Sequence, residues 1–260
     1  MRNKDIKNIL IIGGHDPTGG AGIQADIEVS NKYKCNAFVV ITCLTSQNTK
    51  NVYMVQNAKK DLVYDSIKKV CSEFKIDIIK IGLVPSISIA KEIFNAIQKN
   101  QLKKCPIILD PIIMSGSGKK LTTENTIKFI IKNLLPLTTI ITPNKNEYYK
   151  YKEISKKYKI QDGNVNNIAN HILITDFQTR GNKIKSRLIK KEGEIIDYTS
   201  VKKNGSYHGT GCTLSTAIAC NIVNKKSTND AVNISLKYVS KCIRSSYQRG
   251  KSQILTYRYK

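Results

Sequence analysis

The sequence predicts an α/β protein with a mostly parallel central sheet covered by helices on both faces. Three observations support this prediction. Short apolar segments rich in β-branched residues alternate with amphipathic segments along nearly the whole chain. Strands that are apolar on both faces are typical of parallel sheets buried between helices. No linker, repeat or low-complexity tract interrupts the alternation, so the 260 residues are expected to form one domain, residues 1–260.

Each apolar run is interpreted as a strand and each amphipathic run as a helix. Residues 186–199 depart from the alternation, because two apolar stretches flank Lys191-Glu192-Gly193 and predict a small hairpin. The Asn-rich stretch 161–170 is a poor helix. The expected strands are 8–12, 37–43, 77–81, 106–109, 138–141 and 172–175, and the expected helices are 23–34, 62–74, 86–99, 122–133, 144–158, 210–224 and 229–245.

The composition limits the classes of function. Lysine and arginine number 43 against 19 acidic residues, a net charge of +24. Such an excess is typical of nucleic-acid-binding proteins, but here the lysines are spread along the chain, many as KK and KxK pairs, and are not gathered into one block. We therefore expect no specific nucleic-acid binding, only weak association with anions that salt weakens. No apolar run is long enough to span a membrane, so no membrane partner is expected.

The cysteines and histidines indicate no metal cluster or disulfide framework. There are seven cysteines, an odd number, with no CxxC spacing, and the first residues do not resemble an export signal. Reduced thiols in a cytoplasmic protein are therefore expected. The three histidines, His15, His171 and His208, are far apart in sequence and are expected on the surface or in loops.

Two segments near the N-terminus are candidates for ligand binding. Residues 13–26 join the first strand to the first helix, and their glycines would let the backbone approach a ligand closely. Their spacing fits neither a Walker A loop nor a dinucleotide-binding fingerprint. Residues 42–49 follow an apolar strand, and Gln47 carries both a donor and an acceptor for the edge of a heterocycle. The alternatives are a flexible loop and a simple polar turn.

Two further segments place oxygen ligands after strands. Asp110 ends one strand ahead of a Gly/Ser loop, where it could bind Mg²⁺ or phosphate, or merely start an Asp-Pro turn. Asn144 and Glu147 are three residues apart at a helix start, so they share a face. Glu147 could hold a hydrated Mg²⁺, and the pair could equally form a capping box.

The strongest segment is His208-Gly-Thr-Gly-Cys-Thr-Leu-Ser215, which leads into an apolar helix. Its glycines would expose consecutive backbone N–H groups at a helix N-terminus, which favours an anion. The positive field at that position is expected to lower the pKa of the Cys212 thiol below its free value. The alternative is a glycine-rich helix entry with a buried cysteine.

The order and spacing of these motifs resemble those of the hydroxymethylpyrimidine/phosphomethylpyrimidine kinases, a family of the ribokinase superfamily. The resemblance covers nearly the whole chain, and HGTGCTLS and GGAGIQAD are its most specific parts. It also includes ITCLTSQNT, KIGLVPS, ILDPIIMSGSG and TPNKNE, in the family's order.

The resemblance implies a ribokinase-like three-layer α/β/α sandwich, usually a homodimer. It implies that ATP phosphorylates 4-amino-5-hydroxymethyl-2-methylpyrimidine and then its monophosphate, which supplies the pyrimidine half of thiamine diphosphate. Cys212 takes the position at which sugar-kinase relatives carry an aspartate base. The implied substrate-binding residues are Gln47, Asp26 and Gly14, the implied catalytic residues are Cys212, Gly209 and Gly211, and Asn144, Glu147 and Asp110 would organise ATP and Mg²⁺, with Glu147 and Asp110 as metal ligands.

The sequence departs from the family pattern in two places. A lysine expected in the loop after Asp110 is absent, with Ser115 or Gly116 in its place and Lys119 or Lys120 displaced. The Lys-Gly-Gly-His segment expected after the sixth strand is replaced by Thr175-Asp176-Phe177. Two alternatives therefore stay open: a pyridoxal or pyridoxine kinase of the same fold, and a drifted, weakly active relative that still binds the pyrimidine.

Overall fold

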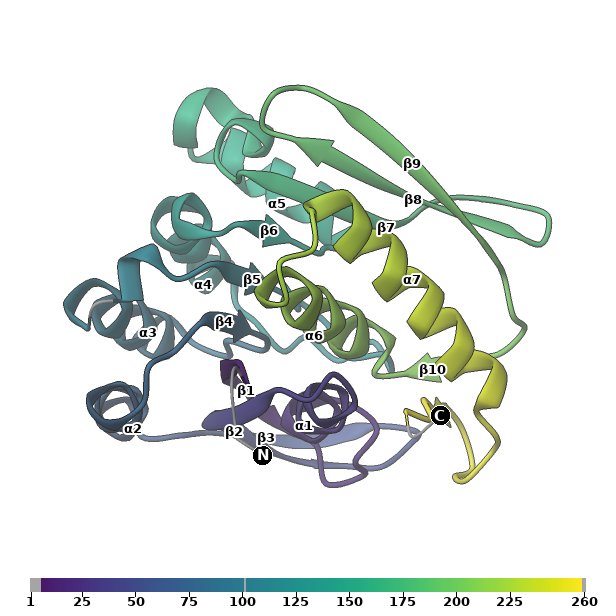
Figure 1. Cartoon of the computed structure of the whole chain (residues 1–260), viewed down its shortest axis with the longest axis horizontal. Coiled ribbons are helices and arrows are strands. Elements are labelled where there is room, and N and C mark those ends of the chain that lie inside the picture. The colour runs from purple at the N-terminus through teal and green to yellow at the C-terminus, as the bar shows by residue number, and fades with distance from the viewer. Residues whose placement is uncertain (1–5, 101, 259–260) are drawn as a thin grey trace.

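The computed structural model describes residues 6–100 and 102–258 and centres on a nine-stranded sheet, β3-β2-β1-β4-β5-β6-β7-β8-β9 (Figure 1). The six strands from β2 to β7 in this order are parallel, whereas β3, β8 and β9 pair antiparallel at the two edges. The strands are β1 (Asn8–His15), β2 (Asn36–Gln47), β3 (Val52–Asn57), β4 (Ile78–Ile81), β5 (Ile107–Leu109), β6 (Ile140–Ile141), β7 (His171–Arg180), β8 (Lys183–Lys190) and β9 (Ile195–Val201).

Helices cover both faces of the sheet, as the apolar strands predicted. Alternate residues of one strand enter two separate cores: Leu10 and Ile12 of β1 enter one core, and Ile9 and Ile11 enter the other. The first core is formed with α2 (Lys60–Glu73), α3 (Ile87–Lys99), α4 (Glu124–Phe129) and α5 (Lys145–Lys157), and the second with α1 (Gly22–Lys32), α6 (Thr210–Val223) and α7 (Thr228–Ser245).

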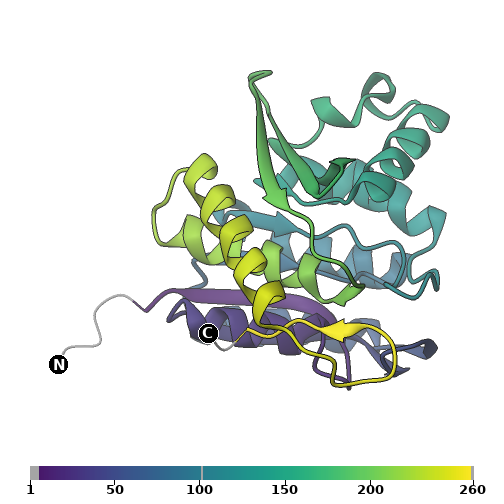
Figure 2. The same ribbon diagram turned by 90° about the vertical axis from the view of Figure 1, so that its right-hand side faces the viewer.

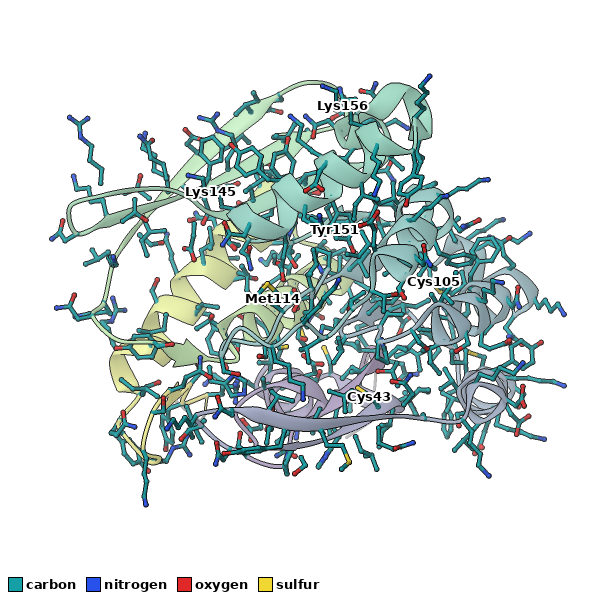
Figure 3. All side chains as sticks on the ribbon, turned by 180° about the vertical axis from the view of Figure 1, so that it is seen from behind. Cys43, Cys105, Met114, Lys145, Tyr151 and Lys156 are labelled. Carbon is teal, nitrogen blue, oxygen red and sulfur yellow. The ribbon has the colours of Figure 1, made fainter. Side chains whose placement is uncertain are left out.

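Helix α5 shows how the sequence pattern selects a buried face. Tyr151 is buried in the core, whereas Lys145 and Lys156 on the same helix are exposed (Figure 3). Asn144 caps the helix as predicted, and its side chain accepts from the Glu147 backbone while the Glu147 side chain accepts from the Asn144 backbone. The capping box therefore fixes where Glu147 sits.

Several boundaries differ from the sequence predictions. The predicted strand 37–43 continues through Gln47, so residues 42–47 are not a turn, and they pair with β3, which was not predicted. The predicted helix 122–133 is α4 followed by a π-helical turn, Ile130–Leu134. The predicted hairpin is β8 and β9, and β7 pairs with β8 to widen the sheet. The stretch 161–170 forms only short 3₁₀ turns, Ile160–Gly163 and Val165–Asn167.

The segment after α7 returns to the main body of the molecule, as the yellow ribbon shows in Figures 1 and 2. There β11 (Ile254–Leu255) pairs with β10 (Tyr207–His208), which comes directly before α6. The carboxyl ends of the parallel strands, the start of α6 and this returning segment therefore meet at one end of the sheet. Of the helices in the described ranges, none is long and apolar enough to span a membrane.

Candidate functional site

A pocket lies where the carboxyl ends of β1, β2 and β4 meet the first turn of α6. Four residues singled out from the sequence line it together: Gly14, Asp26, Gln47 and Cys212. Lys80 lines it as well, although the sequence analysis gave that lysine no role. Ligands of open α/β sheets bind beyond the carboxyl ends of the strands, and this pocket has that position.

Gly14 is required at its position by close packing. A Cβ on this residue would lie 2.9 Å from the Sγ atom of Cys43, a contact that real Cβ atoms do not make. Cys43 is itself fully buried on β2. The glycine therefore lets β1 pack closely against β2 at the wall of the pocket.

Asp26 lies at the pocket as an internal ion pair. Its carboxylate accepts two hydrogen bonds from Lys80 Nζ, at 2.8 and 3.0 Å, and a third from Thr216 Oγ1 at 2.7 Å. Both charged side chains are 1% exposed. Burial lowers the pKa of Lys80, but the charge and hydrogen bond of Asp26, together with the neighbouring Cys212 and Asp110, outweigh burial and hold that pKa above its usual range. Lys80 could have been noticed in the sequence, because it interrupts the otherwise apolar strand Ile78–Ile81.

Cys212 occupies the first turn of α6, as predicted, but its acidity is the opposite of the prediction. Complete burial raises the pKa of the Cys212 thiol to about 12, although the neighbouring Lys80 charge acts to lower it. Loss of hydration therefore outweighs the field of the helix N-terminus. The thiol is protonated near neutral pH, and it lies close enough to the Asp110 carboxylate for that charge to raise its pKa further.

Gly209 and Gly211 shape the start of α6. Gly209 caps the helix with φ +84°, in the left-handed region that favours glycine. A Cβ at Gly209 would collide with the carbonyl oxygen of Gly20, so the loop 13–22 presses directly against the cap. A Cβ at Gly211 would lie 3.6 Å from a carboxylate oxygen of Asp110. The first turn of α6 therefore lies between the pocket and Asp110.

Asp110 and Glu147 form an acidic half of the site beside the pocket. Burial raises the pKa of Asp110 to about 6, and Lys80 partly offsets this effect. Burial, followed by the charge of Asp110, raises the pKa of Glu147 to about 8. Glu147 Oε1 accepts from the Ile113 backbone at 3.3 Å, which ties the carboxylate to the segment after Asp110. The structure thus brings the predicted metal ligands together, with Asn144 holding Glu147.

This acidic half suits a hard divalent cation. Its donors are carboxylate oxygens, which Mg²⁺ prefers, and a nearby positive charge would favour their ionised forms. On the adjacent strand end, the buried hydroxyl oxygen of Thr142 has no hydrogen-bond partner. Within the described residues no group of three His, Cys, Asp or Glu could hold a metal. Water and phosphate oxygens would have to complete the coordination of Mg²⁺.

A row of polar side chains along the rim of the pocket was not predicted from the sequence. His208 Nε2 lies 2.7 Å from Asp16 Oδ2, and Gln47 lies close enough to Asp16 to lower its pKa. Burial acts to raise the pKa of Asp16, but these contacts, with that from Thr18, hold it well below its usual range. Each histidine was expected on the surface or in a loop. All three belong to strands, β1, β7 and β10, and are half-buried, with 14% of the His208 side chain exposed.

The two departures from the family pattern have visible structural outcomes. Lys119 Nζ donates to the Tyr53 carbonyl at 2.6 Å, so the displaced lysine is held against β3. Asp176 has φ +50°, the left-handed conformation that a glycine adopts without strain. Arg187 stacks over the ring of Phe177, 4.3 Å from its centre. The backbone at the substituted loop thus keeps a glycine-like conformation although its side chains differ.

Several solved structures share the fold over nearly the whole chain. A pyridoxal kinase from Staphylococcus aureus in complex with pyridoxal covers 98% of this chain and 94% of its own, with a TM-score of 0.84 and 20% identity. A phosphomethylpyrimidine kinase from Clostridium difficile covers 91% of this chain and 99% of its own, with a TM-score of 0.71 and 30% identity. The ribokinase-like α/β fold is therefore confirmed.

Sequence relatives agree with the second structure. A hydroxymethylpyrimidine/phosphomethylpyrimidine kinase of Aquifex aeolicus is 28% identical over 93% of this chain and 96% of its own length. One of Saccharomyces cerevisiae is also 28% identical over 93% of this chain, but the match covers 46% of that protein, so the chain spans about half the length of the yeast relative. The model of the phosphomethylpyrimidine kinase family matches residues 16–256, and the chain therefore belongs to that family.

Proposed function

We propose that this protein transfers the γ-phosphoryl group of ATP to the hydroxymethyl oxygen of 4-amino-5-hydroxymethyl-2-methylpyrimidine, and then phosphorylates the monophosphate, as a step of thiamine diphosphate biosynthesis. The observation that carries the proposal is the arrangement around the first turn of α6. That turn separates a pocket lined by Gln47 and Cys212 from the carboxylates of Asp110 and Glu147.

The pocket half would hold the pyrimidine. Gln47 offers a donor and an acceptor to the ring edge and is oriented by its contact with Asp16. Gly14 would line the ring's binding site with backbone alone. The Asp26 carboxylate already accepts three hydrogen bonds, from Lys80 and Thr216, which limits what it can offer to the ring. Its role would be to hold Lys80 beside the pocket.

Phosphoryl transfer proceeds through a loose transition state, so positioning and neutralisation of charge carry most of the catalysis. The N–H groups that open α6 between Gly209 and Cys212 would bind the transferred phosphoryl group. A bound Mg²⁺ would neutralise phosphate charge, with Asp110 and Glu147 as its protein ligands and Asn144 holding Glu147 in place.

The raised pKa of Cys212 requires a route for its own proton. Asp110 lies close enough to Cys212 for its charge to act on the thiol, so its carboxylate is the acceptor that we assign to that proton. The substrate hydroxyl can pass its proton to the sulfur while the thiol proton moves to the Asp110 carboxylate, so no free thiolate has to form first. The proton ends on Asp110, and the new O–P bond forms as the bond to ADP breaks.

An assay of the purified chain tests the proposal. With ATP and Mg²⁺, we expect ADP release to depend on the hydroxymethylpyrimidine, and mass spectrometry to detect first the monophosphate and then the diphosphate. Phosphorylation of pyridoxal in preference to the pyrimidine would replace the proposal with the pyridoxal kinase alternative. Tight binding of the pyrimidine without any ADP release would identify a drifted, non-catalytic relative.

We also propose that the protein is a cytoplasmic homodimer. All seven cysteines are free thiols, as expected in a reducing compartment. The outer face of β2 and β3 exposes large apolar side chains, with Leu44 51%, Tyr53 58% and Met54 61% exposed, which favours a protein interface there. Light scattering after size exclusion is expected to give twice the mass of the chain, and Leu44→Lys with Met54→Lys to give monomers.

A further inference from the structure

Residues 249–258, here called the strap, connect three loops that surround the site. The backbone N–H of Gln253 donates to the Thr49 carbonyl at 3.1 Å, on the turn after β2. Thr256 Oγ1 donates to the carbonyl of His208 at 2.6 Å. A Cβ on Gly116, in the loop after Asp110, would collide with the Gln253 side chain, so that loop touches the strap too. The strap therefore joins parts of the site that are distant in sequence.

Arg258 is the buried residue at the end of the strap. Its side chain is 1% exposed. Nε donates to Thr213 Oγ1 at 2.8 Å, and Nη1 donates to Glu28 Oε2 at 3.0 Å. The terminal nitrogens also donate to the carbonyls of Gly19 and Gly20. The guanidinium thus fills the space between the glycine-rich loop and the first turn of α6.

These bonds continue to the cap of α6. Thr213 Oγ1, which accepts from Arg258, donates to the Gly209 carbonyl at 2.7 Å. The Gly209 carbonyl also accepts the Thr213 amide at 3.0 Å, the bond that closes the first turn. The Gly20 carbonyl, the other acceptor of Arg258, also presses against Gly209. The position of the cap is therefore set through two contacts of one guanidinium, with Thr213 and with the Gly20 carbonyl.

The charge of Arg258 is informative as well. A cation near a helix N-terminus opposes the helix dipole, whereas an anion there is stabilised by both. Burying an arginine with one carboxylate partner at this position costs free energy if the contact is purely structural. The same positive charge becomes favourable when a phosphate is bound nearby.

We propose that Arg258 is a positioning residue that aligns the N–H groups between Gly209 and Cys212 with the transferred phosphoryl group. The inference rests on the proposed function for its catalytic meaning. The contacts that support the inference involve only the first turn of α6, the glycine-rich loop and the strap. The planar fork of arginine is needed to reach acceptors on two elements, and a lysine cannot span them.

The kinetic test compares Arg258→Gln and Arg258→Lys with two controls. Arg244→Gln removes an exposed arginine of α7, and Tyr238→Phe loosens the same segment by removing the hydrogen bond to the Arg258 carbonyl without changing the guanidinium. Removing one oxyanion-hole donor typically lowers kcat by about 10²–10³-fold. We expect a loss of about that size for both Arg258 variants, with the KM for the pyrimidine changed by less than about 3-fold.

Added guanidinium ion at low millimolar concentration is expected to restore part of the kcat of Arg258→Gln, and ammonium is not. Both controls are expected to retain the kcat of the unmodified protein. An Arg258→Gln protein with full kcat and a reduced free energy of unfolding would overturn the proposal and leave Arg258 as a structural contact only.

Hydrogen exchange separates this inference from the proposed function. In Arg258→Gln we expect the Thr213 amide to exchange at least about 10-fold faster, while the Cys220 amide, on the later part of the same helix, keeps its rate. If the unmodified protein phosphorylates no pyrimidine, the proposed function fails, and this measurement alone decides the inference. Equal Thr213 exchange in the variant and the unmodified protein would refute it.

Discussion

The two halves of the site are both buried, yet they treat charge in opposite ways. In the pocket half, the Asp26 carboxylate is matched by Lys80 and Thr216. In the acidic half, no salt bridge within the described ranges reaches Asp110 or Glu147, and burial raises both pKa values. One half is electrostatically complete by itself, and under the proposed function a cation would complete the other. This difference suits a rigid pocket that would bind a neutral ring and an adjacent, more adaptable site that would bind charged phosphates.

The largest expected effect lies at the boundary between the halves. Cys212→Ala should fold normally, because a small side chain replaces a buried thiol, and should lower kcat by about 10²–10⁴-fold through loss of the proton acceptor. Steady-state kinetics of ADP release measure this.

Cys212→Asp serves as the comparison, since it restores a proton acceptor and is expected to keep part of the activity. Full kcat in Cys212→Ala would show that the proton leaves the substrate by another route.

The pocket half can be tested through stability. Lys80→Met leaves Asp26 buried without its partner, and breaking a buried ion pair in this way costs about 3–5 kcal/mol. Urea unfolding measures the free-energy change.

The matched control is the double variant Lys80→Met with Asp26→Asn, which removes both charges and is expected to recover most of the lost stability. If the single variant is as stable as the double variant, the ion pair does not complete this half of the site.

The acidic half predicts a pH dependence of Mg²⁺ binding. Protonated carboxyls bind Mg²⁺ poorly, so the apparent affinity should rise with pH through the pKa of Asp110, about 6, and that of Glu147, about 8. Calorimetric titrations between pH 5.5 and 8.5, about the range of both groups, measure this. Glu147→Gln should remove the rise near the upper value, and an unchanged profile in that variant would mean that Glu147 does not bind the metal.

The same raised pKa values affect stability with a fixed sign. The folded protein holds these two protons to higher pH than the unfolded chain, so metal-free protein should lose stability as pH rises from the ordinary carboxyl range near about 4 toward 8. Saturating Mg²⁺ should flatten that slope.

The smallest effect is expected from Gln47→Leu in the pocket half. An unpaired heterocycle edge costs roughly 1–3 kcal/mol, so the KM for the pyrimidine should rise by about 5- to 150-fold and the KM for ATP should change little. Gln56→Leu, on the neighbouring strand β3 and exposed, is the matched control. Equal pyrimidine binding in both variants would exclude a role for Gln47 in recognition.

The sequence predicted the alternation of strands and helices because apolar periodicity follows directly from burial. It missed β3, although Val52–Val55 are apolar, because the strand is only six residues long and mostly exposed. The sequence motifs also predicted one site for Gly14, Gln47, Cys212, Asp110 and Glu147, because each residue follows a predicted strand or lies at the start of a predicted helix. The prediction of a lowered pKa for Cys212 was wrong, because the burial of the thiol depends on neighbours that are remote in sequence.

Partners across long sequence separations were also missed. Lys80 is 54 residues from Asp26, and His208 is 192 residues from Asp16. Nothing in the local pattern pairs these residues, although a lysine inside an apolar strand is a clue that some buried partner exists. The composition of the 249–258 segment gave no indication that it contacts the site.

The bonds of Arg258 also have a consequence for folding. The contact between Arg258 and Gly20 spans 238 residues, so closing it requires a large loop of chain to be ordered. Contacts of such long range form after local helices and neighbouring strands, because their loop entropy has to be overcome by structure already present. During synthesis, a chain still held at the ribosome short of this arginine could therefore build most of its sheet while the cap of α6 is not yet fixed. The ability to bind the transferred phosphoryl group would then appear late, when the Arg258 contact closes. Incompletely folded chains would therefore contribute little turnover.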